Sequence, residues 1–336
     1  MNKMILDCTL RDGGYVNNWE FDTNKALAIC DGLYEAGIRW IEIGIMGLNP
    51  QIGKQTKFSD FEQIKPLLVN RREDCHYAIM VTTSVSDKFK FPLCSQDTPD
   101  VIRIAYFKPE LQKTMEFAEN LKNLGYHVFL QAMATFMYDE DELDTMVEKI
   151  NTLHPTAFYM VDSFSTMYVD DVIKMRDGIL NKLDSDIMFG FHAHNNIQMA
   201  FSNVQEFLNV ETSRGLLVDA SIYGMGRGAG NVPLELIMNF MNRKYGEKYN
   251  TSIVLMLFQR YLENIYEEYS WGYTLPYYLT AVNSINSAWG WFFMNNGISD
   301  LERLEMAFKL IPDKWTYTLN IDIGKEILEK VNEVSA

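Results

Sequence analysis

Eight short apolar runs recur along the chain at intervals of 25 to 36 residues, and this spacing constrains the fold more than any other feature. Runs that are almost continuously apolar are typical of strands buried on both faces. Each interval can hold one crossover helix, which a connection between parallel strands requires. Eight such units within about 245 residues predict a (β/α)8 TIM barrel. The runs begin at Met4, Trp40, His76, Val101, His127, Ala157, Ile187 and Leu216.

Amphipathic segments separate several of these runs. The segment 23–38 has a glycine stop at Gly37, and the segment 109–126 opens with Pro109 and stops at Gly125. We therefore expect one crossover helix in every interval. A doubly wound sheet is the alternative. That fold usually has fewer strands, and no GxGxxG loop follows the first apolar run here.

The pattern changes near residue 246, where strand-like runs end. The remainder is predicted to be mostly helical and is rich in aromatic residues, with eleven between Tyr261 and Phe293. No low-complexity linker precedes it. We therefore predict a catalytic barrel over residues 1–245 and, over residues 246–336, a helical extension that packs on the barrel.

Composition excludes several classes of function. The 336 residues are 47% hydrophobic, enough for a large core, and carry a net charge of −15. Such an acidic surface repels phosphate backbones and anionic lipid, so we expect neither nucleic acid nor membrane as a partner. The four cysteines form no CxxC pair, and the sequence has no apolar run typical of a signal peptide or membrane span. These features predict a cytoplasmic protein with reduced thiols.

The ends of the first and seventh runs carry the strongest chemical signals. The first run is followed by Arg11 and Asp12, and the seventh ends in His192-Ala193-His194. Side chains at i and i+2 on a strand face the same side, so both imidazoles face one space. Two neutral imidazoles and the Asp12 carboxylate from a nearby strand make a facial site for a divalent cation, Mn²⁺ or Mg²⁺. The alternative is a hydrogen-bonded pair of core histidines.

The eighth run leads into a glycine-rich segment, "YGMGRGAGN", which ends at Asn231. Glycines let the backbone approach a ligand closely. Asn231 precedes Val232 and Pro233, a pattern typical of a helix cap. Beside the first two motifs, Asn231 is also a candidate for a further metal ligand. Metal hydrolases commonly carry HxH on the first strand, so its position on the seventh disfavours that class.

With these motifs in this order, the chain resembles the metal-dependent lyase and aldolase barrels. That family includes 4-hydroxy-2-oxovalerate aldolase, hydroxymethylglutaryl-CoA lyase and isopropylmalate synthase. "TLRDGG", "GFHAHNN" and "ASIYGMGRGAGNVPLE" carry the resemblance, which covers roughly residues 4–245. "VDSFSTMYVDDV" (161–172) makes the chain most similar to the 4-hydroxy-2-oxo-acid aldolases, and "WGYTLPYY" (271–278) is faintly similar to one of their C-terminal segments.

The resemblance implies roles for individual residues. Asp12, His192 and His194 match the metal ligands, and Asn231 matches a ligand of the lyase branch. Among the remaining positions, Arg11 matches the catalytic arginine, Ser163 a residue near the substrate carboxylate, and Tyr273 a tyrosine that the C-terminal segment lends to the active site. The aldolases place a histidine base three residues after the metal aspartate, where this chain has Tyr15. A phenol with an ordinary pKa of about 10 is a poor base at neutral pH.

The implied reaction joins or cleaves a carbon–carbon bond through an enolate of the pyruvate type. The metal draws electron density from the ketone of a 2-oxo acid, and Arg11 donates to the same oxygen as charge develops on it. The implied reactants are therefore a 2-oxo acid and an aldehyde. Related aldolases dock a dehydrogenase on their C-terminal region. The extension here could do that, form a homodimer or cover the barrel.

Three other functions remain open at this point. A Schiff-base aldolase would need a lysine, and Lys108 is the one candidate, although a solvated loop lysine is the simpler interpretation. An acyl-CoA lyase or synthase of the same family would need a basic cluster for the phosphate tail, and none is evident. A barrel that kept its metal site only for binding, as a scaffold, would have lost the enolate-stabilising residues, which are present.

Overall fold

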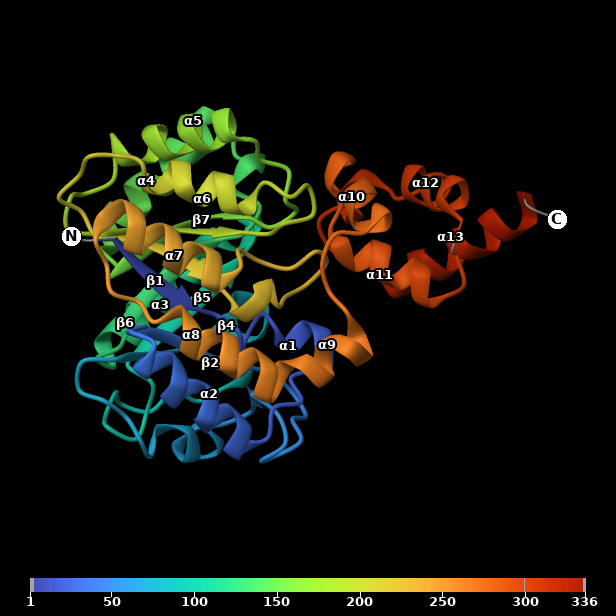
Figure 1. Ribbon diagram of the computed structural model, residues 1–336. Coiled ribbons are helices and arrows are strands. Elements are labelled where there is room, and N and C mark those ends of the chain that lie inside the picture. Colours follow the sequence, from blue (N-terminus) through green and yellow to red (C-terminus); the bar gives the residue numbers. More distant parts are fainter. Residues whose placement is uncertain (1–2, 299, 335–336) are drawn as a thin grey trace.

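The computed structural model describes residues 3–298 and 300–334. Eight parallel strands form a closed barrel that helices surround, and a group of C-terminal helices stands to one side (Figure 1). The ring closes because β1 pairs with both β9 and β2, which confirms the predicted (β/α)8 fold. The barrel strands are β1 (Lys3–Asp7), β2 (Trp40–Met46), β4 (His76–Thr82), β5 (Val101–Tyr106), β6 (His127–Ala132), β7 (Ala157–Asp162), β8 (Met188–Ala193) and β9 (Leu216–Ala220).

The two faces of each barrel strand bury different residues. On β5, Val101 belongs to a cluster inside the barrel, whereas Ile102 and Ile104 belong to the larger cluster between the strands and the helices. This alternation follows from the two-residue period of a strand. Because both faces are covered, the strands appear in the sequence as nearly continuous apolar runs, and all eight begin within one residue of the predicted positions.

Helices cover most of the barrel and then continue beyond it. The long helix after β1 begins at an Asp22 cap, whose side chain accepts from the N–H of Lys25, and it is followed by Gly37 at φ +99°. The helices are α1 (Gly14–Asn17), α2 (Thr23–Glu35), α3 (Leu111–Asn123), α4 (Glu140–Leu153), α5 (Val169–Leu180), α6 (Ala200–Leu208), α7 (Leu234–Tyr245), α8 (Thr251–Leu257), α9 (Glu263–Tyr269), α10 (Leu275–Val282), α11 (Ser287–Asn295), α12 (Leu301–Lys309) and α13 (Ile321–Val334).

The expectation of a crossover helix in every interval is wrong in two places. The structure describes every residue of both intervals. Between β2 and β4 the chain makes only the short strand β3 (Lys57–Phe58) and two 3₁₀ turns. Between β4 and β5 it makes one 3₁₀ segment (Thr83–Lys88). Proline is one physical reason. Pro66 lies in one of these turns, and Pro92 and Pro99 interrupt the second interval, where each removes a backbone donor and limits helix growth.

The C-terminal region divides between two hydrophobic cores. Helices α8 and α9 contribute Val254 and Ile265 to the core that surrounds the barrel, which extends as far as Trp271. Helices α10 to α13 enclose a second core between Ile285 and Val331. The change of core therefore lies some 25 residues beyond position 246, and the domain boundary predicted there stays a prediction. Within the described residues, no helix is both long enough and apolar enough to cross a membrane.

A buried carboxyl group joins the end of β1 to the loop that follows β9. Asp7 Oδ1 accepts the backbone N–H of Thr9 at 3.0 Å, and Oδ2 accepts the Thr9 hydroxyl at 2.8 Å. The Thr9 oxygen in turn accepts the N–H of Ile222 at 2.9 Å. Burial raises the pKa of Asp7 to about 7. The folded protein therefore favours the protonated form of this group at acidic pH.

The Asp7→Asn variant should flatten the dependence of stability on pH. A carboxyl whose pKa is raised by folding contributes its stability below its ordinary pKa and loses it as the pH rises through about 7. Between about pH 5 and pH 8, the free energy of unfolding of the parent protein should therefore fall relative to that of Asp7→Asn, by on the order of a few kcal/mol. Urea unfolding measures this difference. Asp170→Asn, on the exposed start of α5, is the control, and parallel curves for the parent and Asp7→Asn would contradict the assignment.

Candidate active site and metal centre

The loop after β1 carries Arg11 and Asp12 to the carboxyl-terminal mouth of the barrel. The indole N–H of Trp19 donates to the carbonyl of Arg11 at 2.8 Å, and the hydroxyl of Thr56 donates to the preceding carbonyl at 2.7 Å. A Cβ on Gly14 would lie 2.0 Å from the Trp19 ring, so the loop can close only with glycine there. The turn that carries Arg11 and Asp12 is therefore fixed by contacts to its backbone and by the glycine at position 14.

Three predicted metal ligands converge at this mouth. The ligand atoms of Asp12, His192 and His194 all lie within 4.8 Å of one another. The imidazoles come from the end of β8 and the position after it, and their ring centres are 4.9 Å apart. Residues two apart on one strand thus face the same space, as the sequence pattern predicts.

The protonation states of this group suit a cation. Burial by itself raises the pKa of Asp12, but the nearby Arg11 and the two imidazoles outweigh it and hold this pKa well below its usual range. Burial lowers the pKa of His194 to about 3. At neutral pH the cluster therefore offers a carboxylate and a neutral imidazole, which are the forms that bind a metal ion.

Asn231 adds an unpaired oxygen to the same place. Its side-chain nitrogen donates to Asp12 Oδ2 at 2.7 Å and to the carbonyl of Met225 at 3.1 Å. Its Oδ1 is buried and has no hydrogen-bond partner among the described residues. A buried acceptor without a partner costs stability unless a ligand or ion satisfies it. A Cβ on Gly226 would lie 2.3 Å from the Asn231 nitrogen and 2.7 Å from Asp12 Oδ2, which explains the glycine at this position.

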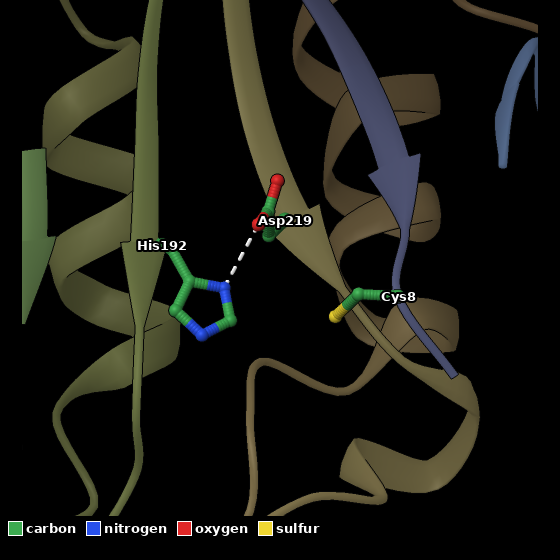
Figure 2. Close-up of side chains that lie close together, drawn as sticks. All are labelled: Cys8, His192 and Asp219. Atoms are coloured by element: carbon green, nitrogen blue, oxygen red, sulfur yellow. Dashed lines mark hydrogen bonds and ion pairs between the residues drawn. The ribbon is translucent and has the colours of Figure 1, made fainter. Parts of the chain in front are cut away.

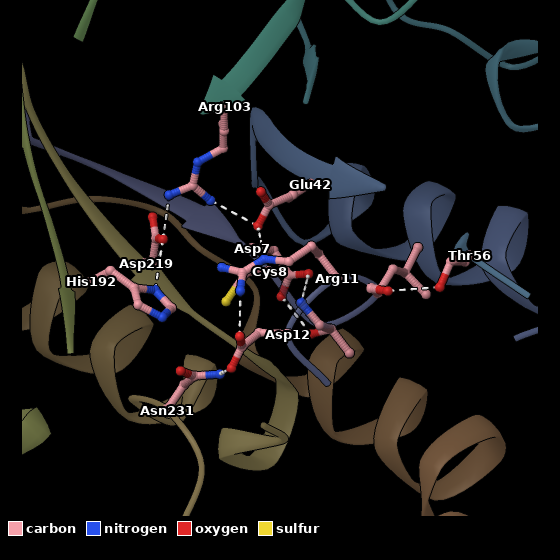
Figure 3. A network of polar contacts seen from close by, with 12 residues as sticks. Asp7, Cys8, Arg11, Asp12, Glu42, Thr56, Arg103, His192, Asp219 and Asn231 are labelled. Carbon is pink, nitrogen blue, oxygen red and sulfur yellow. Dashed lines mark hydrogen bonds and ion pairs between the residues drawn. The ribbon is translucent and has the colours of Figure 1, made fainter. Parts of the chain in front are cut away.

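A chain of buried charges continues from this cluster across the barrel interior (Figure 3). Glu42 Oε2 accepts from Arg11 Nε at 2.7 Å and from Arg103 Nη1 at 2.8 Å. Arg103 also pairs with Asp219, whose Oδ2 contacts His192 Nδ1 at 2.8 Å. With Asp219 bound to Nδ1, the other ring nitrogen of His192 is left for a ligand.

Sequence reasoning missed the three inner members of this chain. Glu42, Arg103 and Asp219 each stand alone in the middle of an apolar strand, in "WIEIGI", "VIRIAYF" and "LLVDA". A charged residue at the centre of a strand buried on both faces must find partners inside the barrel. That is the signal that could have identified them, because charges that point into the barrel from different strands can pair only with one another.

Cys8, His192 and Asp219 form a second group of possible ligands, drawn in Figure 2. Burial raises the pKa of the Cys8 thiol well above its usual range, and its sulfur lies 3.3 Å from the carbonyl oxygen of Ala220. Asp219 is already engaged by Arg103 and His192. A thiol that holds its proton is a poor ligand, so the group around Asp12 is the better candidate.

The same mouth holds a cavity of about 220 Å³ that contains most of the predicted site. Ser163 lies in it and accepts the N–H of Ala134 at 2.9 Å. Tyr15, from α1, also lines it, with the guanidinium carbon of Arg227 3.8 Å from the centre of its ring. The remaining lining residues are Arg11, Asp12, Met80, Thr82, Ala105, Phe107, Gln131, Met133, Val161, His192, His194, Asn286, Tyr317 and Thr318.

Tyr273 is not brought to this cavity, contrary to the expectation for the C-terminal segment. It is 51% exposed, and its ring lies 6.4 Å from that of Tyr278. The C-terminal region instead supplies Asn286, Tyr317 and Thr318, which lie on loops around α11 and before α13. The tyrosine that this region places beside the cavity is therefore Tyr317, and the catalytic role expected for Tyr273 stays a prediction.

Lys108 is also absent from the cavity lining. It forms an ion pair with Glu142 of α4, and its ammonium group lies 5.7 Å from the ring centre of Tyr138. No lysine is among the described residues that line the cavity. A solvated loop lysine, the simpler interpretation of Lys108, agrees with this position.

The donor set fits a divalent cation. One carboxylate and two imidazoles suit several divalent transition metals, Mn²⁺ among them. The Asn231 oxygen without a hydrogen-bond partner adds an acceptor beside them. The Asp219 carboxylate behind His192 matches the arrangement that orients metal-binding histidines in many proteins.

Comparison with known proteins agrees with the fold and the motifs. Residues 2–258 match the model of the HMGL-like family. Oxaloacetate decarboxylase from Mycobacterium tuberculosis is 26% identical over 246 residues, which cover 72% of this chain and 70% of that protein. 4-Hydroxy-2-oxovalerate aldolase from a Marinomonas species is 24% identical over 249 residues, covering 72% of each chain. The carboxyl transferase domain of Rhizobium etli pyruvate carboxylase, solved with pyruvate, shares the fold at a TM-score of 0.75 and 10% identity, over 99% of this chain and 62% of that one.

Replacing Asp219 by asparagine should weaken metal binding without removing a ligand of the group formed by Asp12, His192 and His194. Loss of a carboxylate behind a metal-binding histidine typically lowers metal affinity by about tenfold to a hundredfold. Calorimetric titration with Mn²⁺ measures the change. Asp100→Asn is the matched control, because Asp100 forms a similar carboxylate–imidazole pair with His76 at the opposite end of the barrel. Equal Mn²⁺ affinity in Asp219→Asn and the parent protein would show that Asp219 does not orient a ligand.

Proposed function

The chain belongs to the HMGL-like family, and on that premise we propose that it is a divalent-metal-dependent carbon–carbon lyase of the aldolase type. Its substrate is a 4-hydroxy-2-oxo acid, which it cleaves to, or forms from, a pyruvate-type enolate and an aldehyde. One observation carries this proposal, namely the convergence of Arg11 on the same cavity as the cluster of Asp12, His192 and His194. The aldolase name of a relative supports it.

Arg11 is the residue that stabilises the developing charge. Asp12 and the two histidines would hold the cation, which supplies Lewis-acid polarisation of the keto group. Arg11 donates through Nε to Glu42 and through one terminal nitrogen to Asp12, and its other terminal nitrogen has no hydrogen-bond partner among the described residues. A buried guanidinium with one free donor can therefore bind the keto oxygen as it becomes negative.

Ser163 provides a donor for the carboxylate of the substrate. Its oxygen accepts the N–H of Ala134, which leaves its own proton available within the cavity. A hydroxyl fixed in this way can donate to an anion without first having to break a bond to the protein. The 2-oxo acid is then held at its keto group and its carboxylate together, which orients the bond that breaks.

Cleavage of a 4-hydroxy-2-oxo acid also needs a proton acceptor. The bond between C3 and C4 breaks, its electron pair enters the enolate, and the proton of the 4-hydroxyl must leave at the same time. We assign the transfer of this proton to Tyr15, which lines the cavity at the position where the resembled aldolases carry a histidine, and whose partly exposed phenol passes its own proton to water as it accepts that of the 4-hydroxyl. The assignment makes Tyr15 necessary for aldol chemistry but not for formation of the enolate from pyruvate, in which water takes up the proton lost from C3.

Decarboxylation of a 2-oxo acid is the second candidate, and the make-up of the cavity favours it. Apart from the predicted ligands, the described lining residues include no imidazole and no carboxylate that could serve as a base. When the 2-oxo acid carries a second carboxylate on C3, the loss of that carboxylate as CO₂ needs no base, because the electron pair of the breaking bond enters the same enolate. The relative named oxaloacetate decarboxylase supports this alternative.

The other functions considered from the sequence receive less support. A Schiff-base mechanism lacks a lysine, since Lys108 is paired with Glu142 outside the cavity. An acyl-CoA substrate lacks a basic cluster, because Arg11 and Arg227 are the cations among the described lining residues. A purely binding scaffold would not need the free donor of Arg11. Docking of a dehydrogenase or of a second copy on residues 246–336 stays a prediction.

Exchange of the C3 protons of pyruvate in deuterated water tests the proposed function without knowledge of the aldehyde. The Mn²⁺-loaded protein should catalyse exchange, a chelator should abolish it, and Arg11→Lys should slow it by about 10²–10³-fold, as expected for loss of one oxyanion donor. Arg39→Lys, in an exposed ion pair, is the matched control. Nuclear magnetic resonance follows the exchange. A normal rate in Arg11→Lys would overturn the role of Arg11, and a normal rate with the chelator present would overturn the role of the metal.

The Tyr15→Phe variant separates the two candidate reactions. If the protein is an aldolase, this variant should cleave 4-hydroxy-2-oxovalerate about 10²-fold more slowly, which is the usual contribution of a general base. One limb of the pH–rate profile should disappear, while exchange of the pyruvate protons persists. If the protein is a decarboxylase, the parent protein should consume oxaloacetate faster than the aldol substrate, and Tyr15→Phe should retain that activity.

A further inference from the structure

Arg227 is a cation without a counter-ion at the edge of the cavity. It lies in the glycine-rich loop after β9 and lines the cavity that holds Asp12 and the two histidines. Its guanidinium stacks on Tyr15 with the carbon 3.8 Å from the ring centre. Its carbonyl accepts the N–H of Gly230 at 3.0 Å, but its guanidinium makes no ion pair or hydrogen bond with any residue in the described part of the chain. In a protein with 45 acidic residues, an arginine beside a cavity without an acidic partner requires an explanation.

The stacking on Tyr15 leaves the edge of the guanidinium available. Stacking uses the face of this planar group, whereas its five N–H donors point outward in the plane. That fork matches the two oxygens of a carboxylate or a phosphate. Arg11 cannot serve the same anion fully, because Glu42 and Asp12 already occupy two of its nitrogens.

A second and larger cavity begins on the other side of Arg227. It has a volume of about 640 Å³ and shares Tyr15 and Arg227 with the first cavity, so the two adjoin. Its walls come from the barrel loops and from α9 to α11. Glu268, on the exposed end of α9, is the one acidic residue among the described residues that line it, and it does not pair with Arg227. The aromatic members of the lining are Tyr15, Tyr269, Trp271, Tyr277 and Trp291.

The size of this second cavity exceeds what a small aldehyde needs. Pockets of roughly 300–1,000 Å³ hold ligands of drug-like size, and their walls are mostly apolar or aromatic with a few polar groups that fix orientation. An aldehyde of two or three carbons would occupy only a small part of the 640 Å³. The cavity therefore fits a longer fragment that passes Arg227 on its way out of the metal cavity.

We propose that Arg227 binds an anionic group, a carboxylate or a phosphate, on the second fragment of the substrate, and that the body of this fragment lies in the adjoining aromatic cavity. This inference rests on the proposed function for its first step, because the 2-oxo acid end must occupy the cavity of Asp12 and the histidines. It makes Arg227 a specificity-determining residue, and it gives the substrate a second anionic group at the boundary of the two cavities, in addition to the carboxylate of its 2-oxo acid end.

Matched pairs of 2-oxo acids test this inference by binding alone. Calorimetry on the Mn²⁺-loaded protein compares 2-oxoglutarate with 2-oxopentanoate and 2-oxoadipate with 2-oxohexanoate, which differ only in the terminal carboxylate. The diacid of at least one pair should bind about tenfold to a hundredfold more tightly, the gain typical of a charge-assisted hydrogen bond. Arg227→Gln should reduce this ratio to about one, and Arg227→Lys should restore part of it. A terminal phosphonate in place of the carboxylate then tells which anion is preferred.

Arg260→Gln is the control, because Arg260 is exposed and lines neither cavity. It should keep the ratio of the parent protein. Equal affinity for diacids and monoacids in the parent protein, or an unchanged ratio in Arg227→Gln, would overturn the role of Arg227. If the protein binds diacids more tightly than monoacids but does not exchange the protons of pyruvate, the result would instead count against the proposed function. The two conclusions therefore fail in different experiments.

Discussion

The pairing of Glu42 with both Arg11 and Arg103 is the interaction on which the candidate site depends. All three side chains are buried, and charges removed from water are costly unless each one has partners. Removal of one member of such a set typically costs about 3–5 kcal/mol, because the others are left buried and unpaired. The same pairing fixes where the Arg11 guanidinium points, and through Asp219 it fixes the tautomer of His192. Folding stability and the orientation of the reacting groups thus rest on the same contacts.

The charges of this network also explain why a cation and then an anion belong in the cavity. Two arginines, Arg11 and Arg103, face three carboxylates, those of Asp12, Glu42 and Asp219, so the set carries one net negative charge when the histidines are neutral. A divalent cation would reverse that sign to one positive charge. The carboxylate of a 2-oxo acid would then neutralise it. The acidic surface of the protein does not prevent this carboxylate from binding after the cation, because solvent and salt screen distant surface charges more than buried ones.

The sequence predicts the barrel well because strand burial and strand order leave local signals. The eight apolar runs, the paired histidines and the Arg11–Asp12 motif can all be recognised from neighbouring residues, and the structure brings His192, His194, Asp12 and Asn231 together as predicted. The roles of Glu42, Arg103 and Asp219 are different, because each depends on a partner at least 60 residues away in the chain. The two expected helices that are absent have a different cause, because Pro66, Pro92 and Pro99 interrupt those intervals and can be read from the sequence. Tertiary packing decides that Tyr317 and not Tyr273 lines the cavity, and no short pattern around either residue reports that packing.

The cavity has walls from two separate hydrophobic cores. Arg11, Asp12 and the histidines extend from the barrel, whereas Asn286 and Tyr317 lie in segments that contribute Ile285, Trp315 and Leu319 to the core of α10 to α13 or to its surroundings. This division affects how the substrate range of such a protein can change in evolution. Substitutions in the second core can change the shape of the outer wall, and so the molecules that fit, while the charged network in the barrel keeps its partners. A lineage with this architecture can explore new substrates without changing the residues to which we assign the chemistry.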